Sequence, residues 1–192
     1  AMKGGPFIRA LVLGVLLGFL PVVRAAVIVA SSVSRDAVSN AVATAVSGDT
    51  VIIPVGSATW TAGVIISNKT IRLAGMGTNQ TFITDNIPRV TPEVSLIKYY
   101  TTSNALISEI AGLHISSGTV TQEQTSGRIR ILGDSKLVRV HHNVYTNAWS
   151  AIFGAEGFLH GVFDHNRTVT VDHAHPLVLE HGSWQPYNGA TN

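Results

Sequence analysis

Cysteine is absent from this 192-residue chain, and charged residues are scarce, at 12% of the total. Without cysteine there can be no disulfide framework, no thiolate zinc site and no cysteine nucleophile. Globular proteins usually carry about 25% charged residues, so this low charge excludes a disordered tail and most all-helical proteins, whose exposed faces are rich in Lys and Glu. The abundant Val, Ile, Thr, Ser and Gly favour β-structure instead.

A strongly basic region is also missing. The formal net charge is +2, but Lys3, Arg9 and Arg24 all lie within the first 25 residues. The rest of the chain holds 10 Lys and Arg against 11 Asp and Glu, a net charge of −1. No run of basic residues interleaved with aromatics occurs, so we expect no nucleic-acid partner.

The N-terminal segment has the pattern of an export signal. Lys3 and Arg9 precede an apolar run over residues 10–20, and small residues lie close to Ala25. These features are typical of a secretory signal peptide. We predict a signal peptide over residues 1–25, cleavage after Ala25, and a secreted, periplasmic or cell-surface protein that is then free of the membrane. An uncleaved anchor is the alternative, although a membrane span needs about 20 apolar residues.

One amphipathic helix is expected over residues 34–46. Its apolar residues recur at helical spacing on one face, Ser34 suits the N-cap position, and Gly48 supplies the stop. The rest of the chain offers no helical partner, so this helix must cover a structure made of strands.

The remainder of the chain is predicted to form short strands separated by Gly, Asn, Asp and Ser. Hairpin dipeptides are scarce between these segments, which suits a chain that winds steadily in one direction. The predicted strands cover residues 50–53, 63–66, 70–73, 81–84, 96–100, 106–107, 112–115, 128–132, 137–141, 151–153, 161–164 and 177–179.

A repeated pattern supports this winding. Residues 113–116, 140–143 and 163–166 share the order apolar, polar or His, variable, small polar, at offsets of 27 and 23 residues. Periods of about 20–50 residues indicate a solenoid. We expect Val140 to lie directly against Phe163, and Asn143 and Asn166 to stack at turns in the left-handed conformation.

The order of these features resembles the right-handed parallel β-helix proteins of the pectin lyase-like superfamily, over roughly residues 34–181. The residues that carry the resemblance are the capping helix, the strand that follows Gly48-Asp49, the turn at residues 73–77, and the His-Asn turns. The resemblance implies an all-β fold: a right-handed single-stranded parallel β-helix (solenoid) with an N-terminal capping α-helix. We expect this domain to cover residues 26–192 and to be incomplete at its C-terminus, where no cap follows residue 180.

The candidate site lies in the last part of the chain, where titratable groups cluster. By resemblance, Asp164 corresponds to the calcium-binding Asp of the "Trp-Ile-Asp-His" element of pectate lyases, which makes Asp164 the candidate metal ligand and calcium the candidate cofactor. An eliminase also needs a base, and His142, Asp164 and His165 are the candidate catalytic residues. The alternative is that Asp164 and His165 are turn residues bonded to neighbouring backbone, because the chain has no Arg-x-Pro-x-x-Arg segment.

Two other polar segments have less specific patterns. His173 and His175 could hold a transition metal if a third ligand lay near them, although a solvated loop is the default interpretation. Arg128 and Arg130 resemble part of a polygalacturonase element that is otherwise missing here, so we interpret this segment as an ordinary strand with two exposed arginines.

Trp149 and Trp184 are the candidate substrate-binding residues, because a flat indole ring can cover the apolar face of a sugar. The alternative is that they plug the ends of the core. We therefore expect a monomeric, secreted or cell-surface protein that binds or processes polysaccharide, as a polysaccharide lyase or glycoside hydrolase if it is an enzyme. A non-catalytic surface or adhesion module is the alternative.

Overall fold

The structure is a computed structural model that describes residues 25–89, 94–102, 105–120 and 127–180. The predicted signal peptide and Trp184 lie outside these residues, apart from Ala25. Along the chain the elements are β1 (Val27–Val29), α1 (Arg35–Thr44), β2 (Thr50–Ile53), β3 (Gly56–Trp60), β4 (Val64–Ile66), β5 (Arg72–Gly75), β6 (Thr81–Asp85), β7 (Ile97–Thr101), β8 (Ser108–Ala111), β9 (His114–Ser117), β10 (Ile129–His141), β11 (Val144–Asp164) and β12 (Arg167–Glu180).

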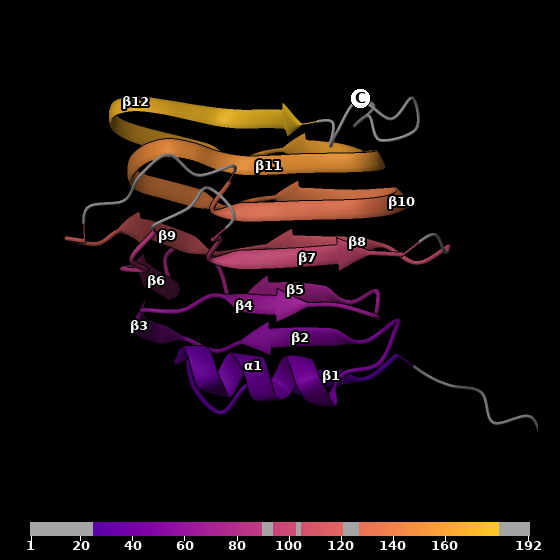
Figure 1. Ribbon diagram of the computed structural model, residues 1–192. Helices are drawn as coiled ribbons and strands as arrows, with labels where there is room; N and C mark the ends of the chain where they lie inside the picture. The colour runs from indigo at the N-terminus through magenta and orange to yellow at the C-terminus, as the bar shows by residue number, and fades with distance from the viewer. Residues whose placement is uncertain (1–24, 90–93, 103–104, 121–126, 181–192) are drawn as a thin grey trace, which may run out of the picture.

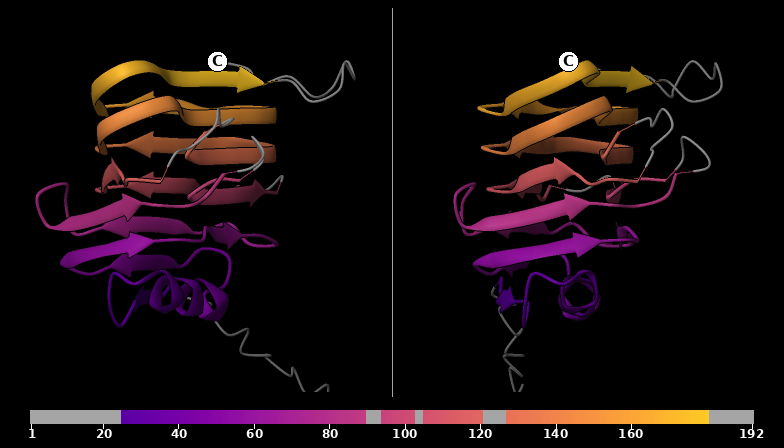
Figure 2. Two further views of the ribbon diagram at one scale, coloured as in Figure 1. Left: turned by 60° about the vertical axis from the view of Figure 1, so that its left-hand side comes forward. Right: turned by 90° about the vertical axis from the view of Figure 1, so that its left-hand side faces the viewer.

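The fold is all-β apart from one helix, and every pairing between the described strands is parallel. Apart from the pairs β1–β2, β10–β11 and β11–β12, strands do not pair with the next strand in the chain. Instead β2, β5, β8 and β10 form one ladder, β3, β6, β9 and β11 a second, and β4, β7 and β10 a third. Long strands carry the chain round from one ladder to the next, so the result is one curled parallel sheet, compatible with a solenoid (Figures 1 and 2).

The predicted contact between Val140 and Phe163 is confirmed, because these residues are register partners in the parallel pair β10–β11. The first repeated segment, residues 113–116, does not have the predicted register, because Val140 pairs with Ile110 and not with Leu113. The chain turns at Gly112, which has a φ of 71° and so places Leu113 beyond the corner. Apolar–polar alternation continues on both sides of such a corner, and the pattern alone therefore does not fix the register.

Several predicted strands merge into longer ones. β10, β11 and β12 run for 13, 21 and 14 residues, because pairing continues across the corners. Gly133 and Gly157 are register partners at one such corner, with φ of 112° and 110°. A Cβ on Gly157 would lie 2.2 Å from the carbonyl oxygen of Gly133, so this corner requires glycine. The strands β1 and β3 were not predicted, and β3 (Gly56–Trp60) contains no run of apolar residues. The strand predicted over residues 106–107 is wrong, because β8 begins only at Ser108.

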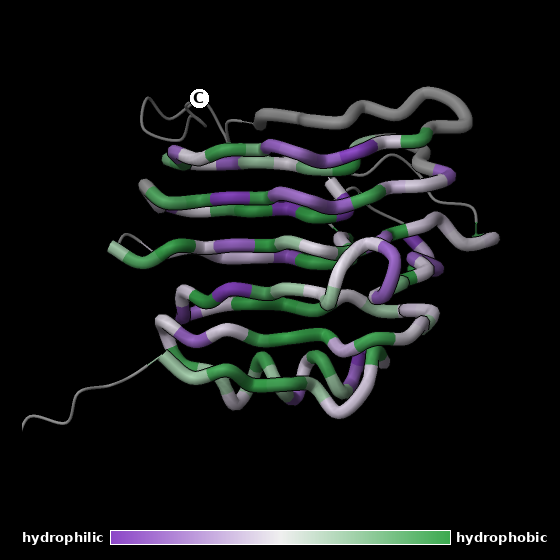
Figure 3. The backbone as a smooth tube through the Cα atoms, turned by 180° about the vertical axis from the view of Figure 1, so that it is seen from behind, coloured by the Kyte–Doolittle hydropathy of each residue, from purple (hydrophilic) through white to green (hydrophobic). Residues whose placement is uncertain are grey.

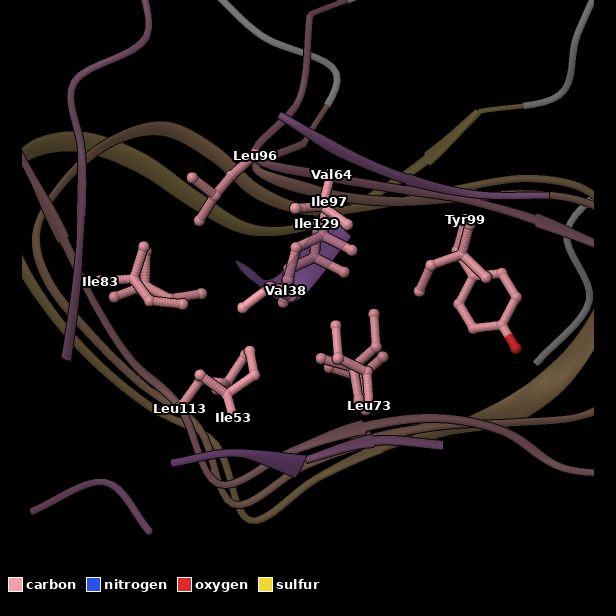
Figure 4. Close-up of a cluster of buried hydrophobic side chains, with 14 of the residues drawn as sticks. Val38, Ile53, Val64, Leu73, Ile83, Leu96, Ile97, Tyr99, Leu113 and Ile129 are labelled. Atoms are coloured by element: carbon pink, nitrogen blue, oxygen red, sulfur yellow. The ribbon is translucent and has the colours of Figure 1, made fainter. Parts of the chain in front are cut away.

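The core is formed by the inward-facing residues of the three ladders. Alternate side chains along a strand point to opposite faces of the sheet, so one residue in two is buried. Leu73, Ile83 and Ile97 come from different ladders and point into the same interior (Figure 4).

The helix covers the N-terminal end of the sheet, as predicted (Figures 1 and 2). Ser34 is the N-cap, and its side chain accepts a hydrogen bond from the backbone N–H of Ala37. The helix ends at Thr44, two residues before the predicted end. Lys69 stabilises that end, because its Nζ donates to the carbonyl oxygens of three residues in the last turn and cap, Val42, Ala43 and Ala45. No helix of the described residues is long and apolar enough to cross a membrane.

Candidate functional site

Outward-facing polar side chains line up across four adjacent strands, β5, β8, β10 and β11. Arg72, Glu109 and Arg139 are successive register partners on β5, β8 and β10, and His141 is the register partner of Asp164 on β11. We call these five side chains the charged face. Seen from behind in Figure 3, hydrophilic residues gather on the strands towards the C-terminal end of the stack, whereas the strands next to the helix are mainly hydrophobic.

Asp164 is held by two side chains of this region. Arg139 donates hydrogen bonds to both carboxylate oxygens, from Nε to Oδ1 at 3.0 Å and from Nη2 to Oδ2 at 2.7 Å. Nδ1 of His165 lies 2.6 Å from Oδ2. The hydrogen bond from Arg139, and secondly the one from His165, hold the pKa of Asp164 well below its usual range. Asp164 therefore stays ionised, and the partners of its carboxylate are the side chains of Arg139 and His165.

A second chain of contacts runs from Glu109 to His142. Oε2 of Glu109 lies 3.5 Å from Nε of Arg72, and Oε1 lies 3.1 Å from Nε2 of His141. Nδ1 of His141 in turn lies 2.7 Å from Nδ1 of His142. The two networks together bring His142, Asp164 and His165 to one corner of the sheet, and the catalytic roles of these three residues stay predictions.

The left-handed residues at this corner are His142 and His165, with φ of 51° and 52°. The prediction that Asn143 and Asn166 adopt this conformation is wrong by one position, although their predicted stacking is confirmed by hydrogen bonds. The side chain of Asn143 is buried inside the turn, where Oδ1 accepts from the backbone N–H of Leu113. The preceding residue must make the turn so that the asparagine amide can point inward.

The described residues contain no group of three or more His, Asp or Glu placed to hold a metal ion together. Asp164 as a calcium ligand stays a prediction. A calcium ion would have to share the two carboxylate oxygens with Arg139, because both already accept hydrogen bonds from it.

The substrate-binding roles of Trp149 and Trp184 stay predictions. Trp149 lies on β11, but the described residues do not include its side chain or any part of Trp184. His173 and His175 lie on β12, so the solvated-loop interpretation of this segment is wrong for the backbone. The described part of the structure does not include the side chains of His173 and His175.

The prediction of two exposed arginines is wrong. Arg128 and Arg130 are 2% and 4% exposed. Nη1 of Arg128 contacts the buried carboxylate of Asp85, which Arg89 also binds, and Nη2 of Arg130 lies 2.5 Å from Oε2 of Glu156. Burial lowers the pKa of Arg128, and the charge of Asp85 opposes that shift. The carboxylates allow these arginines to be buried, and no local sequence pattern indicates partners so distant in the chain.

A cavity of about 300 Å³ that no sequence pattern indicates lies at the glycine corner between β10 and β11. It lies apart from the charged face, and the carboxylate of Glu156 on its wall is bound by Arg130. The other lining residues are Leu132, Gly133, Asp134, Gly157 and Phe158.

Comparison with known proteins finds no matching family model, no matching curated protein and no matching solved structure.

Proposed function

We propose that this chain is a right-handed parallel β-helix of the pectin lyase-like kind, exported by its N-terminal segment and active outside the cell or at its surface. Parallel ladders, a capping helix at one end and stacked asparagines at a turn support this assignment. The proposed state in solution is a monomer, which size-exclusion chromatography tests.

The proposed role is to bind a polysaccharide along the charged face. The observation that carries the proposal is the alignment of donors and acceptors on adjacent strands, at the strand spacing of about 4.8 Å. Arginine side chains only donate hydrogen bonds and carboxylates only accept them, so the face offers both partners that sugar hydroxyls need. Arg72 and Arg139 balance Glu109 and Asp164, so we do not expect strong selection for a polyanion.

The same contacts favour binding over cleavage at Asp164. A carboxylate whose pKa is held low cannot act as a general acid, and it is a weak general base. The two hydrogen bonds from Arg139 stabilise the ionised form of Asp164 and so oppose its protonation.

The test is to mix the purified protein with polygalacturonate, alginate and a neutral xylan, with and without calcium. Affinity electrophoresis measures binding, and ultraviolet absorbance measures any unsaturated product. We expect retardation by at least one polymer and no product. Arg72→Gln and Arg139→Gln should weaken the retardation, whereas Arg35→Gln, at the first position of the helix, should not.

Two results would contradict this proposal. Product formation that Asp164→Ala abolishes would establish a lyase. Failure of every polymer in a broad panel to bind would favour the alternative of a scaffold or adhesion module.

A further inference from the structure

The imidazole rings of His142 and His165 lie one above the other on successive turns. Their centroids are 4.8 Å apart and their planes are parallel. Both residues have nearly the same backbone φ, so both side chains leave the turn in the same way. Both are exposed, and the side chain of His165 is 66% accessible. The repeat therefore presents two equivalent imidazoles to solvent at one corner.

Asp164 fixes the tautomer of His165. Its Oδ2 lies 2.6 Å from Nδ1 of His165, and Arg139 binds both oxygens of the same carboxylate. An ionised carboxylate can only accept hydrogen bonds, so Nδ1 of His165 carries the hydrogen. Nε2 of the neutral ring then keeps its lone pair.

Glu109 fixes the tautomer of His142 through His141. Nε2 of His141 faces the carboxylate of Glu109 at 3.1 Å and must therefore carry the hydrogen. Nδ1 of the neutral His141 is then an acceptor, and Nδ1 of His142, 2.7 Å away, must be the donor. Nε2 of His142 keeps its lone pair as well, and none of the described residues bonds to Nε2 of either exposed ring.

We propose that Nε2 of His142 and Nε2 of His165 together bind one transition-metal ion, such as Zn²⁺ or Cu²⁺. A metal-ligating histidine almost always donates its other ring N–H to a carboxylate or another acceptor, and both rings do so here. Imidazole suits these ions, whereas calcium takes oxygen ligands, so this site differs from the calcium site expected at Asp164.

The site is open. Two protein ligands leave the other coordination positions to water or to an oxygen of a bound molecule. Zinc–nitrogen bonds are about 2.1 Å long, so rings that stack at 4.8 Å must tilt towards each other to share one ion. The exposure of both side chains leaves room for that tilt.

The test uses the full, untagged protein after EDTA treatment and dialysis, titrated with ZnCl₂ or CuCl₂ by calorimetry. His142→Asn and His165→Asn are the informative variants, because Asn68 and Asn147 already adopt a positive φ in this chain. Each variant should bind one equivalent of the metal ion at least about tenfold more weakly than the parent. His160→Asn, which removes an exposed histidine of β11, is the control and should bind like the parent.

Copper electron paramagnetic resonance supplies a second readout. The parent spectrum should report two equatorial nitrogens, and each single variant should lose this signature while its thermal unfolding stays unchanged. The proposal is wrong if neither variant binds this equivalent about tenfold more weakly than the parent, or if His160→Asn weakens it as much.

Discussion

Asn166 lies directly against Asn143, one coil earlier in the chain. Oδ1 of Asn166 accepts hydrogen bonds from both the backbone N–H and the side-chain Nδ2 of Asn143, each 3.0 Å long. Oδ1 of Asn143 in turn accepts from the backbone N–H of Leu113. One amide on each turn thereby satisfies backbone groups that the corner leaves without a strand partner.

Replacing Asn143 with Ala should lower the free energy of unfolding by about 3 kcal/mol. The change removes the bonds from Asn143 to Leu113 and Ile110 and leaves buried backbone groups without partners. Urea denaturation followed by circular dichroism measures the loss. Asn40→Ala, on the exposed side of the helix, is the matched control and should change stability by less than about 0.5 kcal/mol. Equal losses in the two variants would contradict the assigned role.

The pairing of Val140 with Phe163 could be predicted because it depends only on periodicity, which sequence shows directly. The register of Leu113 could not, because it depends on where the chain turns. The position of the left-handed residue in this turn could not be predicted either. Asparagine tolerates a positive φ, but here the amide of Asn143 is needed inside the turn, where it binds Leu113. The preceding residue, His142, therefore adopts the positive φ of the turn.

The proximity of His142 and His165 could be predicted, because these two residues occupy matching positions in successive repeats, and Asp164 directly precedes His165. The contacts of Arg139 with Asp164 and of Glu109 with His141 could not be predicted, because only the strand register places these residues side by side. An ion pair between residues 25 or more positions apart leaves no local pattern. The same limit explains the burial of Arg128, whose partner Asp85 lies 43 residues earlier.

The two buried tyrosines should respond differently to loss of the hydroxyl group. The hydroxyl of Tyr99 accepts from the backbone N–H of Ile71 at 2.6 Å and donates to its carbonyl oxygen at 2.8 Å. The hydroxyl of Tyr145 is buried and has no hydrogen-bond partner among the described residues, and burial raises its pKa far above the usual range. Tyr99→Phe should therefore cost about 1–3 kcal/mol, whereas Tyr145→Phe should be neutral or stabilising. Parallel chemical denaturation of both variants decides this, and a larger loss for Tyr145→Phe would show that its hydroxyl is bonded.

Asp85→Asn should be among the most damaging conservative changes in the chain. Asp85 is fully buried and binds both Arg89 and Arg128, so the substitution leaves two buried guanidinium groups without their shared carboxylate. Breaking such a pair typically costs about 3–5 kcal/mol. The same change at Asp36, whose side chain is 85% exposed beside Arg35, should cost less than about 1 kcal/mol. Similar melting temperatures for the two variants would contradict the burial of this cluster.

Asp49 should make stability depend on pH. Its carboxylate accepts from the backbone N–H groups of Val46 and Ala26, and these bonds lower its pKa in the folded chain. A lowered folded-state pKa contributes stability that is complete above the unfolded pKa of about 3.9 and is lost as pH falls towards the folded value. Asp49→Asn should therefore destabilise the protein at neutral pH, and its difference from the parent should shrink below about pH 4. Denaturation at a series of pH values measures this, and a pH-independent difference would show that the charge has no role.

Signal cleavage after Ala25 should strengthen the contact between Ala26 and Asp49. In the uncut chain the backbone N–H of Ala26 donates to Oδ1 of Asp49 at 2.8 Å, and cleavage would turn this nitrogen into a charged ammonium group. Hydrogen bonds between two ionised groups are stronger than those of a neutral amide. A chain that begins at Ala26 should therefore melt at a higher temperature near pH 6 than the same chain acetylated at Ala26. The advantage should disappear above about pH 10, where an amino terminus is neutral, and it should be absent in Asp49→Asn. If the free and acetylated chains melt alike near pH 6, the terminus makes no ion pair and Asp49 serves only as an acceptor for backbone amides.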